Sequence, residues 1–223
     1  MTERAAIAWT GSLFLVAMVA AIASNGLMVS IIGADDYLAQ LVARDTHLRL
    51  AAVFMVVNCL SVAGIGVLAF HLLRRDFSVP AVGYLVIRIV EAVILLLGVI
   101  SLLSLPSIGE AFVQAGSETS IYLRELADHA VNQNWYAYNV AMIFLGFGSL
   151  FLCYVLFVGK LIPRLLTLLG FGGYLLLGTA STLAILGIDI GLIATLPVFL
   201  FEVTFGTWLI VKGLGGKNAE FTE

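Results

Sequence analysis

The hydrophobic positions of this chain fall into six long runs that polar segments separate. These runs cover residues 8–32, 49–72, 80–104, 137–158, 163–186 and 192–211, each to within a few residues. An α-helix that rises about 1.5 Å per residue needs about 20 residues to cross a bilayer core about 30 Å thick, and every run meets that length. No strand-like alternation is present, and backbone groups in lipid must find partners inside their own helix. The pattern therefore predicts an all-α bundle of six transmembrane helices.

Composition strengthens this interpretation. Of the 223 residues, 61% are hydrophobic and 11% are charged, and the mean hydropathy is +1.10, whereas about half of the residues of a soluble domain are apolar. We therefore expect residues 1–223 to form a single membrane domain of a polytopic integral membrane protein. The first run imitates a signal peptide, but its apolar stretch from Ala5 to Ile32 far exceeds the signal-core length of about 7 to 15 residues. We interpret it as a retained first span.

One polar segment carries a helical pattern of its own. Within residues 105–136 apolar side chains recur at helical spacing opposite a charged and amide-bearing face. The apolar positions are Leu123, Leu126, Ala127, Ala130, Val131 and Trp135, and the polar positions are Arg124, Glu125, Asp128 and Asn132. We expect an outer amphipathic helix over about 119–135 that continues into the fourth span.

The basic residues divide unequally between the two ends of the predicted spans. One end holds Arg4, Arg74, Arg75, Lys160, Arg164, Lys212 and Lys217, and the other holds Arg44, Arg49 and Arg124. Cytoplasmic flanks of membrane helices are enriched in Lys and Arg, so we predict that both termini are cytoplasmic and that the protein is a multi-pass protein of the plasma (inner) membrane. The small net charge of -3 gives no indication of a nucleic-acid partner.

Three ionisable residues lie inside the predicted spans. Arg88 and Glu91 share one face of the third span and lie about 12 and 17 Å from its start, whereas Glu202 lies about 15 Å inside the sixth. Each such charge costs about 2.5 to 3.5 kcal/mol on insertion scales, so unpaired charges would be expensive. We therefore predict one intramembrane polar cluster in which Arg88 bridges both glutamates, with Asn58 and Tyr84 as polar neighbours.

This cluster would carry a net charge of -1 if all three groups were ionised. Burial and repulsion between like charges would then favour a proton on one glutamate. Pro197 lies one turn before Glu202, where a proline can kink the sixth span. Intramembrane ionisable residues usually serve function, although a buried ion pair can also do no more than fix helix register.

Other candidate residues give weaker signals. His71 ends the second span beside two arginines, where an interfacial side chain is the simpler interpretation. His47 and His129 lack a metal-ligand spacing, so we predict no metal site, and the sequence identifies no cofactor or catalytic residue. Cys59 and Cys153 lie at different depths, offset by about 9 Å, and should remain unpaired.

Several stretches resemble the family known as domain of unknown function 4386, which comprises bacterial multi-span membrane proteins. They are Arg49, FHLL at 70–73, IRIVEA at 87–92, YVLFVGKLIPRLLTLLGFGGYL at 154–175 and LPVFLFEVTFGTWLIVKGL at 196–214. The resemblance covers most of the chain and implies the membrane architecture, without an established activity. Arg49 and His71 fall within these stretches, and we treat them as secondary candidates.

Three function classes fit these features, and each would leave a different mark. Transport of a small solute or a proton relay requires a water-accessible cavity that reaches the cluster. An intramembrane enzyme acting on a lipid-soluble substrate would need a lateral opening. A non-catalytic membrane assembly partner would have a dry, fully paired cluster. Candidate partners are the lipid bilayer, a small-molecule or lipid ligand and a second copy of the chain.

Overall fold

A computed structural model describes residues 1–34, 36–115, 117–188 and 190–215. All regular structure in these residues is helical. The elements are α1 (Glu3–Ile32), α2 (Tyr37–Ala43), α3 (Asp45–Leu73), α4 (Ser78–Leu102), α5 (Leu105–Gln114), α6 (Ser117–Gly148), α7 (Leu150–Val158), α8 (Arg164–Ile185), the 3₁₀ turn η1 (Leu192–Thr195) and α9 (Leu196–Val211). The predicted all-α fold is confirmed.

Within the described ranges, six helical segments are long and apolar enough to cross a membrane. They are Glu3–Ile32, Asp45–Leu73, Ser78–Gln114, Thr119–Val158, Arg164–Ile185 and Ile193–Val211. The fourth combines α6 and α7, because the Ser149 N–H donates to the carbonyl of Leu145 and its own carbonyl accepts from Cys153, so the helical hydrogen bonds continue past the break. The chain is therefore a multi-span membrane protein.

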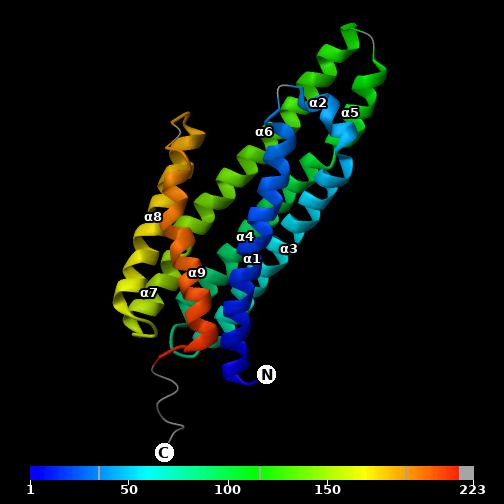
Figure 1. Cartoon of the computed structure of the whole chain (residues 1–223). Coiled ribbons are helices and arrows are strands. Elements are labelled where there is room, and N and C mark those ends of the chain that lie inside the picture. Colours follow the sequence, from blue (N-terminus) through cyan, green and yellow to red (C-terminus); the bar gives the residue numbers. More distant parts are fainter. Residues whose placement is uncertain (35, 116, 189, 216–223) are drawn as a thin grey trace, which may run out of the picture.

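The six spans form a ring in chain order. Each of α1, α3, α4, α6, α8 and α9 packs against the next, and α9 closes the ring against α1. Figure 1 shows that α1 begins and α9 ends at the same end of the bundle, which we call the terminal end. There the Arg4 guanidinium donates to the carbonyls of Ile210, Val211 and Lys212 at 3.3–3.4 Å. These carbonyls have no partner within their helix, so Arg4 caps α9 and ties it to α1.

Two glycine contacts allow the helices of this ring to approach closely. A Cβ at Gly11 would lie 2.5 Å from the carbonyl oxygen of Gly206, where α1 crosses α9. A Cβ at Gly146 would lie 2.5 Å from the backbone nitrogen of Gly178, where α6 crosses α8. Both separations are too short for any side chain, which explains why small residues mark these crossings.

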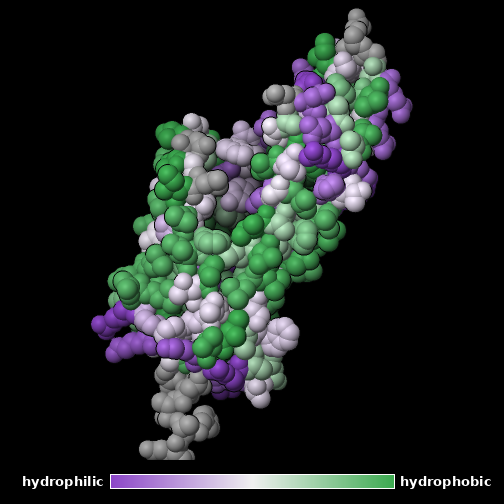
Figure 2. Space-filling model, viewed as in Figure 1, coloured by the Kyte–Doolittle hydropathy of each residue, from purple (hydrophilic) through white to green (hydrophobic). Residues whose placement is uncertain are grey.

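The opposite end of the bundle carries a second, smaller core. Buried side chains of α2, α5 and the first half of α6 pack together with the ends of α1, α3 and α4, including Leu38, Leu41, Leu105 and Ile108. We call this part the cap, and this end of the molecule the cap end (Figure 1). In Figure 2 hydrophilic side chains cover the cap, and a largely hydrophobic surface lies between it and the terminal end.

A polar contact in the cap joins two distant parts of the chain. The Tyr37 hydroxyl of α2 donates to the Asp128 carboxylate of α6. Burial, and the carboxylate that accepts from it, raise the pKa of Tyr37 above its ordinary value. The polar segments that separate the first four predicted spans on this side are thus largely helical, and the segment with the predicted amphipathic pattern lies in α6.

The structure also bears on two smaller expectations. Pro197, which could kink the sixth span, occupies the first turn of α9, where its missing N–H costs no hydrogen bond. The prediction for Cys59 and Cys153 is confirmed, since both are free and buried. Lys217, which entered the charge comparison, lies outside the described residues.

Candidate functional site

A buried ion pair lies in the middle of α4. Arg88 Nη1 is 2.9 Å from Glu91 Oε2, and both side chains are only 2% exposed. The two residues are three apart on the helix, so they share one face that turns away from lipid. Positive and negative charge therefore balance locally within a single helix.

The rest of the Arg88 guanidinium lies among aromatic rings. Its central carbon is 5.7 Å from the ring centroids of Phe14 and Tyr84, within the range of a cation–π interaction. A Cβ at Gly66 of α3 would lie 2.9 Å from the Cβ of Arg88, so this glycine gives the arginine its space. Among the described residues, the Nε of Arg88 and the hydroxyl of Tyr84 are buried and have no hydrogen-bond partner. Arg88 therefore keeps unused donor capacity.

Glu202 has a different partner from the predicted one. Its Oε1 accepts a hydrogen bond of 2.8 Å from the Tyr174 hydroxyl of α8. Arg88 and Glu202 form no ion pair. Within the described part of the chain, Glu91 is the only acidic residue that lies within 4.0 Å of the Arg88 nitrogens. The predicted bridge from Arg88 to both glutamates is therefore wrong as a direct contact.

The packing of α8 against α9 explains this difference. Gly170 and Gly173 of α8 lie against Phe201 and Val198, and a Cβ at either glycine would come within 3 Å of α9. This close approach brings Tyr174 of α8 within hydrogen-bonding distance of Glu202. Sequence reasoning missed Tyr174, although a tyrosine in a buried span needs a partner for its hydroxyl. The sequence did offer one signal for Tyr174, because it follows Gly170 and Gly173, and such small residues mark helix faces that approach a neighbour closely.

All three intramembrane charges line a cavity of about 200 Å³. The residues that line it come from α1, α3, α4, α6, α8, η1 and α9. The polar ones are Asn25, Asn58, Arg88, Glu91, Thr195 and Glu202, and the remainder are mostly aliphatic, aromatic or methionine side chains. Figure 2 shows a hollow with hydrophilic side chains between α1 and α9 in the half towards the cap end. The buried ion pair thus borders an open space.

A second cavity adjoins the first. It measures about 220 Å³, lies between α6, α8 and η1, and includes Trp135, Asn139 and Ser181 in its wall. Tyr138, Leu177 and Thr195 line both cavities. On the other side of the ion pair, the space between Thr10, Tyr84 and Phe205 is an apolar void of only about 20 Å³. The space beside the charges is therefore larger towards the cap end than towards the terminal end.

The remaining predicted residues occupy three different places. Asn58 lines the first cavity, and its side-chain amide donates to the sulfur of Met55 at 3.5 Å. Tyr84 contacts Arg88 through its ring but lines the apolar void instead. His71 is exposed at the terminal end of α3, far along the helix from the cavity.

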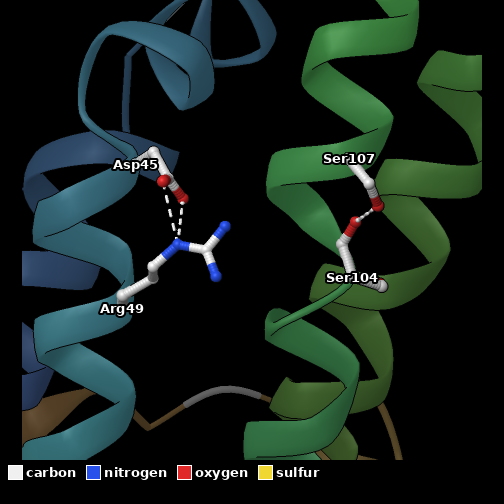
Figure 3. Close-up of polar contacts among 4 residues, drawn as sticks. All are labelled: Asp45, Arg49, Ser104 and Ser107. Atoms are coloured by element: carbon white, nitrogen blue, oxygen red, sulfur yellow. Dashed lines mark hydrogen bonds and ion pairs between the residues drawn. The ribbon is translucent and has the colours of Figure 1, made fainter.

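Arg49 forms an ion pair outside the cavity. Its Nε lies 2.8 Å from both carboxylate oxygens of Asp45, one turn earlier in α3 (Figure 3). Both side chains are substantially exposed, so the pair contributes little to stability. Figure 3 also shows the start of α5, where the Ser107 hydroxyl donates to the backbone carbonyl of Ser104. Arg49 and His71 are not brought together with the intramembrane charges.

A comparison with known protein families gives a match over most of the chain. The family model described as Domain of unknown function (DUF4386) matches residues 9–213. The chain belongs to this family. The match reaches into all six spans and includes every residue that lines the cavity, so the cavity lies wholly within the DUF4386 domain. Comparisons with curated proteins and with solved structures gave no match.

The geometry gives this DUF4386 domain a site with defined chemical capacity. Arg88 and Glu91 neutralise each other, whereas Glu202 holds its carboxyl group against the neutral hydroxyl of Tyr174. Glu202 is only partly buried, and it is the charged group of the wall that no opposite charge contacts directly. A carboxyl group in such a position can bind a cation or exchange a proton.

Proposed function

We propose that this chain transports a small solute across the membrane through the central cavity, with Glu202 as a proton-exchanging group. One observation carries the proposal: the cavity within the bundle has all three intramembrane charges in its wall. Ionisable residues at this depth are expensive, and in membrane proteins they typically mark solute or proton pathways. A dry and fully paired cluster, as an assembly partner would have, does not fit this cavity.

The two ends of the cavity support a transport cycle. Towards the terminal end, Gly11 packs directly on Gly206, and the rings of Phe14 and Phe205 meet edge to face with centroids 5.4 Å apart. Towards the cap end, α1 and α9 leave the hollow that Figure 2 shows. A binding site that is open at one end and closed at the other is what one state of an alternating-access transporter requires.

The orientation of this cavity is part of the proposal. The excess of basic residues at the terminal end favours a cytoplasmic location for both termini. The cap and the open end of the cavity would then face outwards from the plasma (inner) membrane. In this orientation the site accepts its solute from outside, while contact between α1 and α9 blocks the way to the cytoplasm.

The gap between α1 and α9 also favours a second candidate function. A lateral opening at membrane depth would admit a lipid-soluble substrate to an intramembrane enzyme, with Glu202 or Glu91 as the acid or base. The two functions differ in the fate of the ligand, which an enzyme alters and a transporter releases unchanged on the other side. Mass spectrometry of the recovered ligand separates them.

Proton flux into liposomes tests the proposed role of Glu202. Liposomes that contain the parent protein should dissipate an imposed pH gradient faster than empty liposomes, as followed by a trapped pH-sensitive dye. Glu202→Gln keeps the shape of the side chain and removes its proton exchange, so its rate should fall to that of empty liposomes. Glu125→Gln makes the same change at an exposed position outside the cavity and should keep the parent rate.

The proposal has clear contrary outcomes. It is wrong if the parent protein and empty liposomes dissipate the gradient equally fast, or if Glu202→Gln retains the parent rate. Circular dichroism and the melting temperature of each variant in detergent would show whether a loss of flux reflects unfolding instead.

A further inference from the structure

We propose that the ligand of this cavity is a small organic monocation with an apolar body, and that its positive group pairs with Glu202. The inference rests on the proposed function and adds a substrate class to that same site. Four features of the cavity support it: its charge, the kind of side chains in its walls, its volume and the place where it opens.

The charge of the wall favours a cation. Arg88 and Glu91 form a close ion pair and cancel each other, whereas Glu202 accepts a hydrogen bond from the neutral Tyr174 hydroxyl and has no ion-pair partner among the described residues. Of the described residues that line the cavity, Arg88 is the only basic one. Glu202 therefore gives the site one carboxylate in excess. A bound anion would face this carboxylate in a low-dielectric space, whereas a cation would neutralise it.

The walls around this carboxylate suit an apolar cation better than a hydrated metal ion. Three aromatic side chains, Phe14, Tyr138 and Phe199, line the cavity and offer ring faces that attract organic cations. Three methionines line it as well: Met18, Met55 and Met142. Methionine is flexible and polarisable, so it adapts to ligands of different shape. Such walls would bury the apolar body of the ligand, while Glu202 fixes its charged group.

The volume limits the size of the ligand. An apolar cavity of about 150 Å³ holds one benzene molecule, so the roughly 200 Å³ available here accommodates one ring with a short ammonium-bearing arm. The adjoining cavity extends the space towards the cap end. Larger drug-like molecules, which occupy pockets of about 300 Å³ or more, would not fit the first cavity alone.

The opening of the cavity explains why an amphipathic ligand would reach it. Ile22 of α1 and Phe199 of α9 line the cavity and are also 57% and 40% exposed on the surface. Ile22 lies ten residues before the end of α1, about 15 Å along the helix, so this rim lies at the depth of the lipid chains. A cation with an apolar body partitions into the membrane interface and can enter sideways between the two helices.

Binding measurements in lipid nanodiscs test the inference without any transport step. The probe is benzyltrimethylammonium, which has one ring and a permanent positive charge. Equilibrium dialysis against nanodiscs with and without protein should show saturable binding to the parent protein. Phenylacetate and 2-phenylethanol, an anion and a neutral molecule of similar size, should bind at least tenfold more weakly. Glu202→Gln should weaken binding of the cation at least tenfold, and Glu125→Gln should leave it unchanged.

A second variant keeps the test decisive if Glu202→Gln is unstable. Ala21→Phe would place a large side chain in the cavity next to its rim, and it should abolish saturable binding of the cation while Glu202 remains in place.

The inference is overturned if phenylacetate or 2-phenylethanol binds as tightly as the cation, if no probe binds saturably, or if Glu202→Gln binds the cation like the parent. Cation binding without proton flux would contradict only the proposed transport, and proton flux without cation binding would contradict only the ligand class.

Discussion

At the scale of single residues, the three intramembrane charges fall into a structural ion pair and a separate carboxyl group. Arg88 and Glu91 satisfy each other inside α4, and aromatic rings surround the remaining face of the guanidinium. Glu202 belongs to another helix and has a neutral partner. The first pair is therefore a structural requirement of the bundle, whereas the second group is available for exchange. Substitutions at the two sites should differ in kind.

Arg88→Ala is expected to destabilise the protein strongly. It leaves the Glu91 carboxylate buried without its partner, and breaking a buried pair in this way costs about 3 to 5 kcal/mol. The melting temperature in detergent should drop clearly, whereas Glu202→Gln, which keeps the hydrogen bond to Tyr174, should change it little. The double variant Arg88→Met with Glu91→Leu removes both charges and should regain much of the lost stability. A melting temperature of Arg88→Ala equal to that of the parent would contradict the structural role.

At the scale of elements, glycine contacts decide which faces of the helices meet. The α6–α8 crossing depends on Gly146, and the α8–α9 packing that brings Tyr174 to Glu202 depends on Gly170 and Gly173. Positions without a side chain thus determine the hydrogen bond of Glu202.

Gly146→Ala is expected to lower stability by about 1 to 3 kcal/mol, the usual cost of overpacking. Its new methyl group would overlap the backbone of Gly178, which cannot move away as a flexible side chain could. Gly172→Ala is the matched control, because a Cβ at Gly172 meets nothing within 4 Å. Thermal unfolding of the two variants in the same detergent compares them directly, and equal melting temperatures would show that the α6–α8 contact is not tight.

The cap allows a separate test at this scale. Tyr37→Phe removes the hydrogen bond to Asp128, which links α2 to α6. A bond of this kind contributes about 1 kcal/mol, so amide exchange in α2 should become roughly fivefold faster. Exchange in the membrane spans should not change, because the cap has its own core. Hydrogen exchange measured by mass spectrometry follows both regions, and unchanged exchange in α2 would mean that this bond does not hold the cap together.

How far the sequence predicts this molecule also depends on the element considered. The six spans follow from the length of their apolar runs, and Arg88 and Glu91 pair as their spacing indicates because both belong to one helix. The partner of Glu202 could not be found in this way, since helical periodicity does not tell which neighbouring helix a residue faces. Likewise, the short helix α2 gives no strong periodic signal, and only tertiary packing in the cap reveals it.

At the scale of the whole molecule, one half is open and the other closed. The spans converge at the terminal end, where Arg4 caps α9, and they leave the cavity towards the cap end. The charge distribution and the cavity thus give the molecule two distinct ends, and the proposed transport depends on how these ends face the membrane.

Labelling of single cysteines in intact cells tests the proposed orientation. The chain has two native cysteines, both buried, and replacing them by alanine provides the background. Tyr122→Cys lies in the exposed part of α6 in the cap, and an impermeant maleimide should label it from outside. Arg75→Cys, between α3 and α4 at the terminal end, should react only after the cells are opened. The reverse pattern would invert the proposed direction of the cavity.

The closed ring of spans has a consequence for the order in which the protein assembles during synthesis. Because α9 is made after the other five described spans and packs on α1, which is made before them, the ring stays open until α9 has been synthesised. Until then Gly11 and Phe14 lack their partners on α9, and the wall that holds Glu202 does not exist. The ion pair lies within α4 and does not depend on α9, whereas the cavity that Glu202 lines is complete only once α9 has packed on α1 and α8.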